Sequence, residues 1–194
     1  DTRGAMAAFE HVARMQPGRI DGPRNMARVA LQDGDLERVY ELLAQCEQID
    51  PGDAQTAWIW GVAQQKAGRY PEAEGAYRHV LLRFPQDRAT WRNLGRVLYL
   101  DGRFDEALRA FDQVLRIDPE DRSAHYHRML SLRSLGREAE AAVSEQAYSY
   151  YQIDESAQAV TRDYRMQHPH ANQEAQSIHV HELSPPVAVP GHGL

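Results

Sequence analysis

Residues 88–121 read RATWRNLGRVLYLDGRFDEALRAFDQVLRIDPED, and this stretch decides the fold. Its apolar side chains recur every three or four residues in two runs, which predicts two amphipathic helices. The positions concerned are Trp91, Leu94, Leu98, Ala107, Phe111, Val114 and Leu115. Gly102 lies between the runs and can end the first helix with a positive φ, and Pro119 ends the second. The stretch is therefore a predicted helix–turn–helix unit.

The same unit recurs along the chain with a period of 34 residues. Three kinds of residue keep this spacing. The prolines are Pro17, Pro51, Pro85 and Pro119. The glycines are Gly34, Gly68, Gly102 and Gly136. A bulky apolar residue stands eight positions before each proline, at Phe9, Leu43, Tyr77 and Phe111. Three markers that share one period indicate a repeated structural unit.

Within residues 88–121, large, small and helix-ending residues follow a known signature. The matching residues are Trp91, Leu94, Gly95, Gly102, Ala107, Phe111 and Pro119. On these residues the chain resembles the tetratricopeptide-repeat (TPR) family, whose 34-residue repeats are helix–turn–helix units. The resemblance implies an all-α fold, a right-handed α-solenoid in which stacked repeats bury one continuous core. Small residues such as Gly61 and Gly95 are expected to let paired helices approach closely, and Trp60 and Trp91 fall on expected core positions.

The chain divides into a partial repeat, full repeats and a C-terminal segment. We expect the second helix of a partial repeat in residues 1–19, four repeats in 20–53, 54–87, 88–121 and 122–153, a capping helix in 154–167, and an extended tail rich in His and Pro in 168–194. A lone second helix at the start would expose an apolar face. We therefore expect the chain to be the C-terminal region of a longer protein, with an upstream part of the same polypeptide or a partner subunit covering that end.

Composition excludes several classes of protein. The net charge of −6 argues against a general nucleic-acid binder, which would carry a basic excess. No apolar run is long enough to span a bilayer. Cys46 is the single cysteine, so neither an intramolecular disulfide nor a thiolate zinc site is expected. Arginine supplies 21 of the 22 basic residues, which indicates a bacterial source. Because no phosphate-binding loop, dinucleotide fingerprint or nucleophile motif is found, we predict a protein that is not an enzyme.

The family resemblance also predicts a binding surface. In TPR proteins, side chains of the first helix of each repeat line a concave groove that holds peptides or partner helices. The residues of this chain at such positions are Arg24, Asn25, Arg28, Trp58, Arg92, Asn93, Arg96, Tyr99, Tyr126, His127 and Arg133. The set is basic and aromatic, and guanidinium groups match carboxylates.

The expected partner is accordingly a protein or peptide with an acidic or carboxylate-bearing segment. The expected function is an interaction or scaffold module, which holds that segment or docks as a subunit of a larger complex. The alternative is that these side chains are solvated and have no specific partner.

The tail suggests a different function through its histidines. Alternating histidines on an extended segment face the same way, and neutral imidazole is a common metal ligand. The candidates are His168, His170, His179 and His181. They favour a metal- or haem-associated accessory module, unless they only form hydrogen bonds with the repeats. A third hypothesis makes the chain the repeat region of a larger enzyme or cytochrome. No other cofactor is expected.

Overall fold

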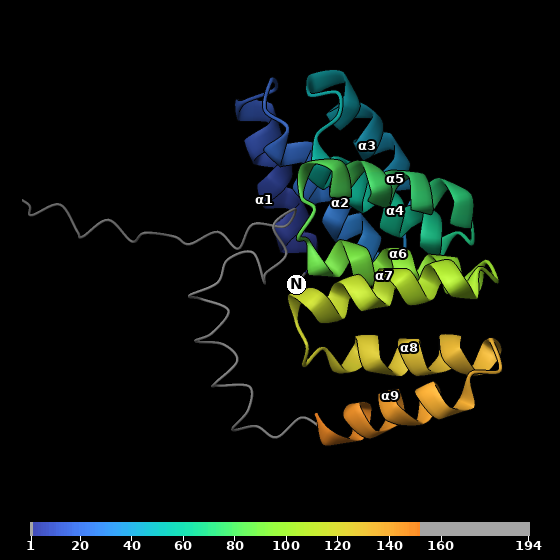
Figure 1. Ribbon diagram of the computed structural model, residues 1–194. Helices are drawn as coiled ribbons and strands as arrows, with labels where there is room; N and C mark the ends of the chain where they lie inside the picture. Colours follow the sequence, from blue (N-terminus) through green and yellow to red (C-terminus); the bar gives the residue numbers. More distant parts are fainter. Residues whose placement is uncertain (1, 152–194) are drawn as a thin grey trace, which may run out of the picture.

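The computed structural model describes residues 2–151, and this part of the chain is a stack of α-helices with no strand. The helices are α1 (Thr2–Met15), α2 (Asp21–Asp33), α3 (Leu36–Ile49), α4 (Ala54–Lys66), α5 (Tyr70–Arg83), α6 (Arg88–Leu100), α7 (Phe104–Ile117), α8 (Arg122–Ser134) and α9 (Glu138–Tyr150). Figure 1 shows them stacked in chain order, which confirms the predicted all-α solenoid. The predicted capping helix (154–167) and tail (168–194) lie outside the described residues.

Most first helices begin at an aspartate. Asp53, Asp87 and Asp121 precede α4, α6 and α8, and each side chain accepts a hydrogen bond from the backbone N–H three residues later. Such a cap satisfies one of the backbone donors that a helix start leaves unpaired, and its negative charge suits the helix dipole. The exception is α2, which follows Ile20 without a side-chain cap.

Each first helix is followed within two residues by a glycine with a left-handed backbone. The φ angles of Gly34, Gly68, Gly102 and Gly136 are 80°, 73°, 79° and 71°. Only glycine adopts this region without a steric penalty, which explains why these four positions keep the 34-residue period. The turn then leads directly into the second helix of the same repeat.

Glycine also lets the two helices of a repeat approach each other. A Cβ at Gly61 would lie 2.7 Å from the Tyr77 ring, and a Cβ at Gly95 would lie 2.7 Å from the Phe111 ring. Both rings are fully buried. Each large aromatic side chain of a second helix therefore fills the space that the glycine of its first helix leaves open.

In the α8–α9 pair, the large buried side chain lies on the first helix instead of the second. Met129 stands at the glycine position and is 5% exposed, while Glu145 stands where α5 and α7 carry the buried ring. Glu145 Oε2 instead lies 2.9 Å from Arg133 Nη2 at the surface. Among the described residues, α9 buries only Ala141 and Ser144, so it contributes less to the core than the central helices.

The core consists of clusters that each span neighbouring helices, and a small one joins α7, α8 and α9. One cluster joins α2, α3 and α4, and a larger one joins α5, α6, α7 and Ala124 of α8. Trp58 and Val62 of α4 pack against both clusters. The first helices α2, α4, α6 and α8 lie next to one another along the stack, and we call the surface they form the first-helix face.

Ion pairs also cross between repeats in the layer of second helices. Arg103, which precedes α7, places Nη1 2.5 Å from Oε2 of Glu74 in α5. Arg78 of α5 lies 3.7 Å from Glu106 of α7. These contacts join the second and third full repeats.

Candidate functional site

The residues predicted to bind a partner come together on the first-helix face. Three lie on α2, one on α4, four on α6 and three on α8: Arg24, Asn25, Arg28; Trp58; Arg92, Asn93, Arg96, Tyr99; Tyr126, His127, Arg133. Arg96, Tyr126 and Arg133 are exposed and the others are half-buried. The tail histidines His168, His170, His179 and His181 lie outside the described residues.

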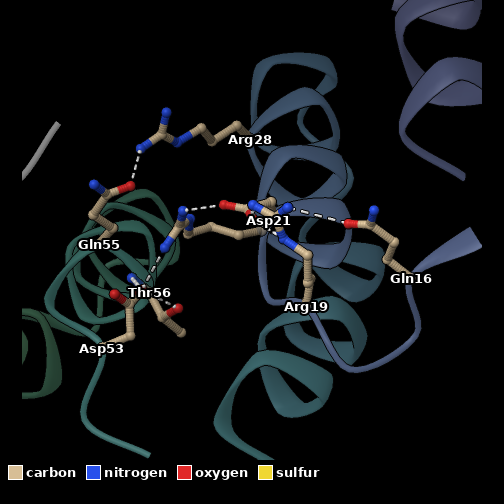
Figure 2. A network of polar contacts seen from close by, with 8 residues as sticks. Gln16, Arg19, Asp21, Arg28, Asp53, Gln55 and Thr56 are labelled. Atoms are coloured by element: carbon tan, nitrogen blue, oxygen red, sulfur yellow. Dashed lines mark hydrogen bonds and ion pairs between the residues drawn. The ribbon is translucent and has the colours of Figure 1, made fainter. Parts of the chain in front are cut away.

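Arg24 holds neighbouring repeats together. Its Nη1 donates to Oδ2 of Asp53 at 3.2 Å, and its Nη2 donates to Oδ1 of Asp21 at 2.9 Å. Figure 2 labels the two carboxylates concerned, Asp21 and Asp53. Burial alone would raise the pKa of Asp53, but hydrogen bonds from Thr56 and the charge of Arg24 outweigh that effect and leave the pKa below its ordinary value. The charge of Arg24 is thus already compensated within the stack.

Arg92 has the same role two repeats further on. Its Nη1 donates to Oδ2 of Asp121 at 3.0 Å, and the Asp121 side chain is 3% exposed. Arg88 also pairs with Asp121, at 3.4 Å, and with Asp118. The aspartate that caps α8 therefore fastens α8 to α6, a function that the repeat signature did not reveal.

Arg28 differs from Arg24, although it lies only one turn further along α2. Its Nη2 donates to Oε1 of Gln55 at 3.2 Å, and none of the described carboxylates forms an ion pair with it. Its Nε is buried without a hydrogen bond to the described residues. Burial lowers the pKa of this guanidinium, the neighbouring charge of Arg24 lowers it further, and the charge of Asp53 opposes both effects. Arg28 is therefore a half-buried cation without an ion-pair partner among the described residues.

Arg96 is the counterpart of Arg28 on α6. The position that Gln55 holds opposite Arg28 is occupied by Ser123, whose side chain is shorter and lies 3.5 Å from His127. Arg96 is exposed and forms no hydrogen bond or ion pair with the described residues. Its guanidinium is free to receive a carboxylate from outside.

His127 lies beside this arginine on α8. Its Nδ1 is 2.7 Å from the carbonyl oxygen of Ser123, which can only accept, so Nδ1 carries the proton. The imidazole stacks on the buried Phe111 ring at 5.4 Å. Burial lowers the pKa of His127, the Ser123 bond opposes this effect, and the charges of Arg96 and Arg92 lower the pKa further. The ring is therefore neutral at neutral pH.

Of the remaining predicted residues, some are exposed enough to contact a partner and others support the core. Tyr126 is 38% exposed, with its ring 5.3 Å from that of Tyr148. Trp58 is half-buried between the two core clusters, and its Nε1 has no hydrogen bond to the described residues. Tyr99 packs on Phe104 at 5.3 Å. Tyr126 thus presents an aromatic ring to solvent, whereas Trp58 mainly supports the core.

One contact at this end of the face was not anticipated from the sequence. The Arg122 guanidinium lies 4.2 Å from the centre of the Tyr148 ring, and its Nε donates to the Tyr148 carbonyl oxygen at 3.3 Å. Tyr148 falls where the repeat pattern departs from its period, so spacing alone did not pair it with α8. The contact fixes the ring against which Tyr126 packs.

The described residues also include a buried thiol and a hollow on the surface. Burial raises the pKa of the Cys46 thiol to about 11, so it stays protonated at neutral pH. No group of three or more potential metal ligands occurs in this part of the chain. A hollow of about 520 Å³ lies on the second helix α7, away from the first-helix face, and is lined by Arg109, Asp112, Gln113, Leu115 and Arg116.

Comparison with known proteins identifies the family. The tetratricopeptide-repeat family model matches residues 60–122 and 101–159, so the chain belongs to the tetratricopeptide-repeat family. Such a fold is that of a protein–protein interaction or scaffold module, and it is typically non-catalytic. Within residues 2–151, every helix is too short or too polar to cross a membrane.

Individual relatives agree with this assignment. The chain is 33% identical over 90 residues to cellulose synthase operon protein C of Pseudomonas fluorescens (strain SBW25). That match covers 46% of this chain but only 7% of the relative. A bacterial origin is consistent with this match.

Solved structures of MamA resemble this one. A crystal structure of MamA has a TM-score of 0.72 at 20% identity and covers 82% of this chain and 91% of that chain. A MamA fragment from Desulfovibrio magneticus RS-1 has a TM-score of 0.72 at 17% identity, covering 77% and 85%. At these identities the likeness establishes the solenoid fold alone.

Proposed function

We propose that the chain holds an acidic segment of a partner protein on its first-helix face. The observation that carries this proposal is the pair Arg28 and Arg96, two cations on that face without an ion pair among the described residues. In a protein with a net charge of −6, such positions favour a ligand that brings its own carboxylates. The planar guanidinium group matches a planar carboxylate better than it matches a diffuse negative surface.

Neighbouring side chains supply the other contacts that a peptide needs. Asn25 and Asn93 lie three residues before Arg28 and Arg96 on the same helices, where their amides can pair with a peptide backbone. The exposed ring of Tyr126 offers apolar area at a small entropic cost. The proposed ligand is therefore a peptide rather than a nucleic acid, with acidic and apolar residues.

The test compares variants of the two layers of the stack. Arg96→Glu combined with Tyr99→Ala alters the first-helix face, and Arg109→Glu places the same charge change on the second helix α7. We expect the first variant to lose most of its captured partner protein in quantitative affinity capture, while Arg109→Glu retains it. Circular dichroism checks that both variants remain folded. Equal capture by the first variant and the unchanged protein would contradict the proposal.

A further inference from the structure

The first-helix face carries one short sequence twice. Residues 24–28 read RNMAR and residues 92–96 read RNLGR, so Arg-Asn-x-x-Arg occurs at the same place in α2 and α6. The two copies are 68 residues apart, which is two repeats. The intervening helix α4 has Trp58 and Val62 at the two arginine positions, and Lys66 in its last turn is its single charged residue.

The structure assigns different roles to the two arginines of each copy. The first arginine, Arg24 or Arg92, is neutralised by the aspartate that caps the next first helix, Asp53 or Asp121. The second arginine lies one turn further along and has no such partner among the described residues. Figure 2 shows this for α2, where the Arg28 guanidinium reaches Gln55 while Asp53 lies toward the start of α4.

Arg28 forms no ion pair with the described residues, although Asp53, which pairs with Arg24, is close enough for its charge to act on Arg28. Arg28 is half-buried and close enough to Arg24 for that charge to lower its pKa. Two neighbouring cations of which only one is compensated repel each other, and this repulsion is relieved when an anion joins the second. At Arg92 and Arg96 the first arginine is likewise paired and the second has no ion pair among the described residues, although Arg96 is exposed rather than half-buried. The two second arginines therefore mark two anion positions on one face.

We infer that the face recognises a peptide at two points, with one acidic residue at Arg28 and a second at Arg96. This inference rests on the proposed function. First helices in successive repeats are neighbours, so two steps of 8–10 Å place these positions roughly 16–20 Å apart. An extended peptide rises about 3.3 Å per residue, so the two acidic residues are separated by roughly five or six positions.

The residues between the two acids have a defined character as well. They pass over α4, whose face offers Trp58 and Val62 and no charge before Lys66. A charged residue there would lose hydration without gaining a partner. The ligand class is thus an extended peptide with two acidic residues flanking a short neutral, mainly apolar stretch.

Synthetic peptides test this spacing directly. Fluorescein-labelled peptides carry two glutamates separated by about two to nine positions in a neutral Ser/Val background. A peptide with one glutamate provides the single-point reference. Binding is followed by fluorescence anisotropy in about 0.15 M salt, for the unchanged protein and for Arg28→Gln, Arg96→Gln and the double variant. Arg109→Gln is the matched control, since it removes an exposed guanidinium from the second helix α7.

We expect the affinity to peak when the glutamates are five or six positions apart. At that spacing the two-glutamate peptide should bind about five- to tenfold more tightly than the single-glutamate peptide. Arg28→Gln and Arg96→Gln should each abolish this advantage, whereas Arg109→Gln should preserve it. Thermal melts of each variant separate loss of binding from loss of folding.

Two outcomes would overturn the inference in different ways. If acidic peptides bind but show no preferred spacing, or if either variant keeps the two-point advantage, two-point recognition is wrong and single-point capture of an acidic segment survives. If no acidic peptide binds more tightly than a glutamine-substituted one, the proposed function fails together with the inference.

Discussion

Gly95 shows how a single residue decides the distance between two helices. Its missing side chain leaves the space that the buried Phe111 ring fills, and Gly61 does the same for Tyr77. A methyl group at Gly95 would lie 2.7 Å from Cε1 and 2.8 Å from Cζ of Phe111, closer than carbon atoms approach without strain. Phe111 is surrounded by other core side chains, so its ring cannot move away from the added methyl group without disturbing them.

The substitution Gly95→Ala should therefore destabilise the protein even though alanine favours helices. We expect the free energy of unfolding to fall by about 1–3 kcal/mol through overpacking. Gly75→Ala is the matched control, because Gly75 is exposed within α5 and has no atom within 4 Å of the added methyl group. That variant should gain up to about 1 kcal/mol from helix propensity. Urea denaturation measures both, and a stabilised Gly95→Ala would refute this account of the packing.

One tryptophan shows what the sequence alone does not predict about burial. Trp60 occupies a repeat position that is buried in Met26 and Leu94, yet its side chain is 39% exposed. Its ring reaches outward and meets Tyr40 of α3 at 5.3 Å. Periodicity gives the direction of a side chain, but whether a large ring fits depends on a neighbour from another repeat.

At the scale of the element, the capping aspartates link local and tertiary structure. Asp53 starts α4 by accepting from the Thr56 backbone and hydroxyl, and it also receives the Arg24 guanidinium. The cap is a local contact, because it joins residues only three positions apart. The ion pair was not predictable from the sequence, because it joins side chains 29 residues apart whose rotamers are set by packing. For the same reason, sequence patterns could not predict the difference between Arg24 and Arg28.

This cap makes the protein sensitive to acid. The folded pKa of Asp53 lies below the ordinary value of about 4, so its stabilising effect is complete above that pH and disappears as the pH falls through the folded pKa. We expect Asp53→Asn to lower the free energy of unfolding by about 1–2 kcal/mol at neutral pH and to reduce the loss of stability on acidification. Melting temperatures measured from neutral to acidic pH test this.

Thr56→Val provides an internal check on the cause. It removes the hydroxyl that donates to Asp53 at 2.7 Å while keeping a similar shape. The folded pKa of Asp53 should rise, and the acid-induced loss should begin at a higher pH. An acid profile of Asp53→Asn that matches the unchanged protein would show that other carboxylates dominate.

At the scale of the whole molecule, stability depends on neighbours along the stack. Helices α5, α6 and α7 supply most of the larger core cluster. By contrast, Val12 and Met15 of α1 are 42% and 70% exposed, and Phe9 is only half-buried. The repeat pattern predicted the order of the helices and the exposed apolar side of the first one, but it did not predict how little of α9 is buried, because that depends on which side chains meet across the α8–α9 pair.

Hydrogen exchange should reveal that gradient. In a repeat stack, opening starts where a helix has the fewest buried contacts. We expect backbone amides of α5–α7 to exchange most slowly and those of α1 and α9 at least about tenfold faster, as measured by mass spectrometry. Uniform protection across residues 2–151 would instead indicate a single cooperative unit.

The ion pairs between repeats also have a mechanical consequence. Arg24–Asp53 and Arg92–Asp121 pin the first two and the last two full repeats at the first-helix face. The middle junction has Trp58 at the corresponding arginine position, and Glu74–Arg103 fastens it in the layer of second helices. The larger core cluster crosses this same junction, from α5 to α6 and α7, so apolar packing there and ion pairs at the two other junctions together hold the span between Arg28 and Arg96 at one length.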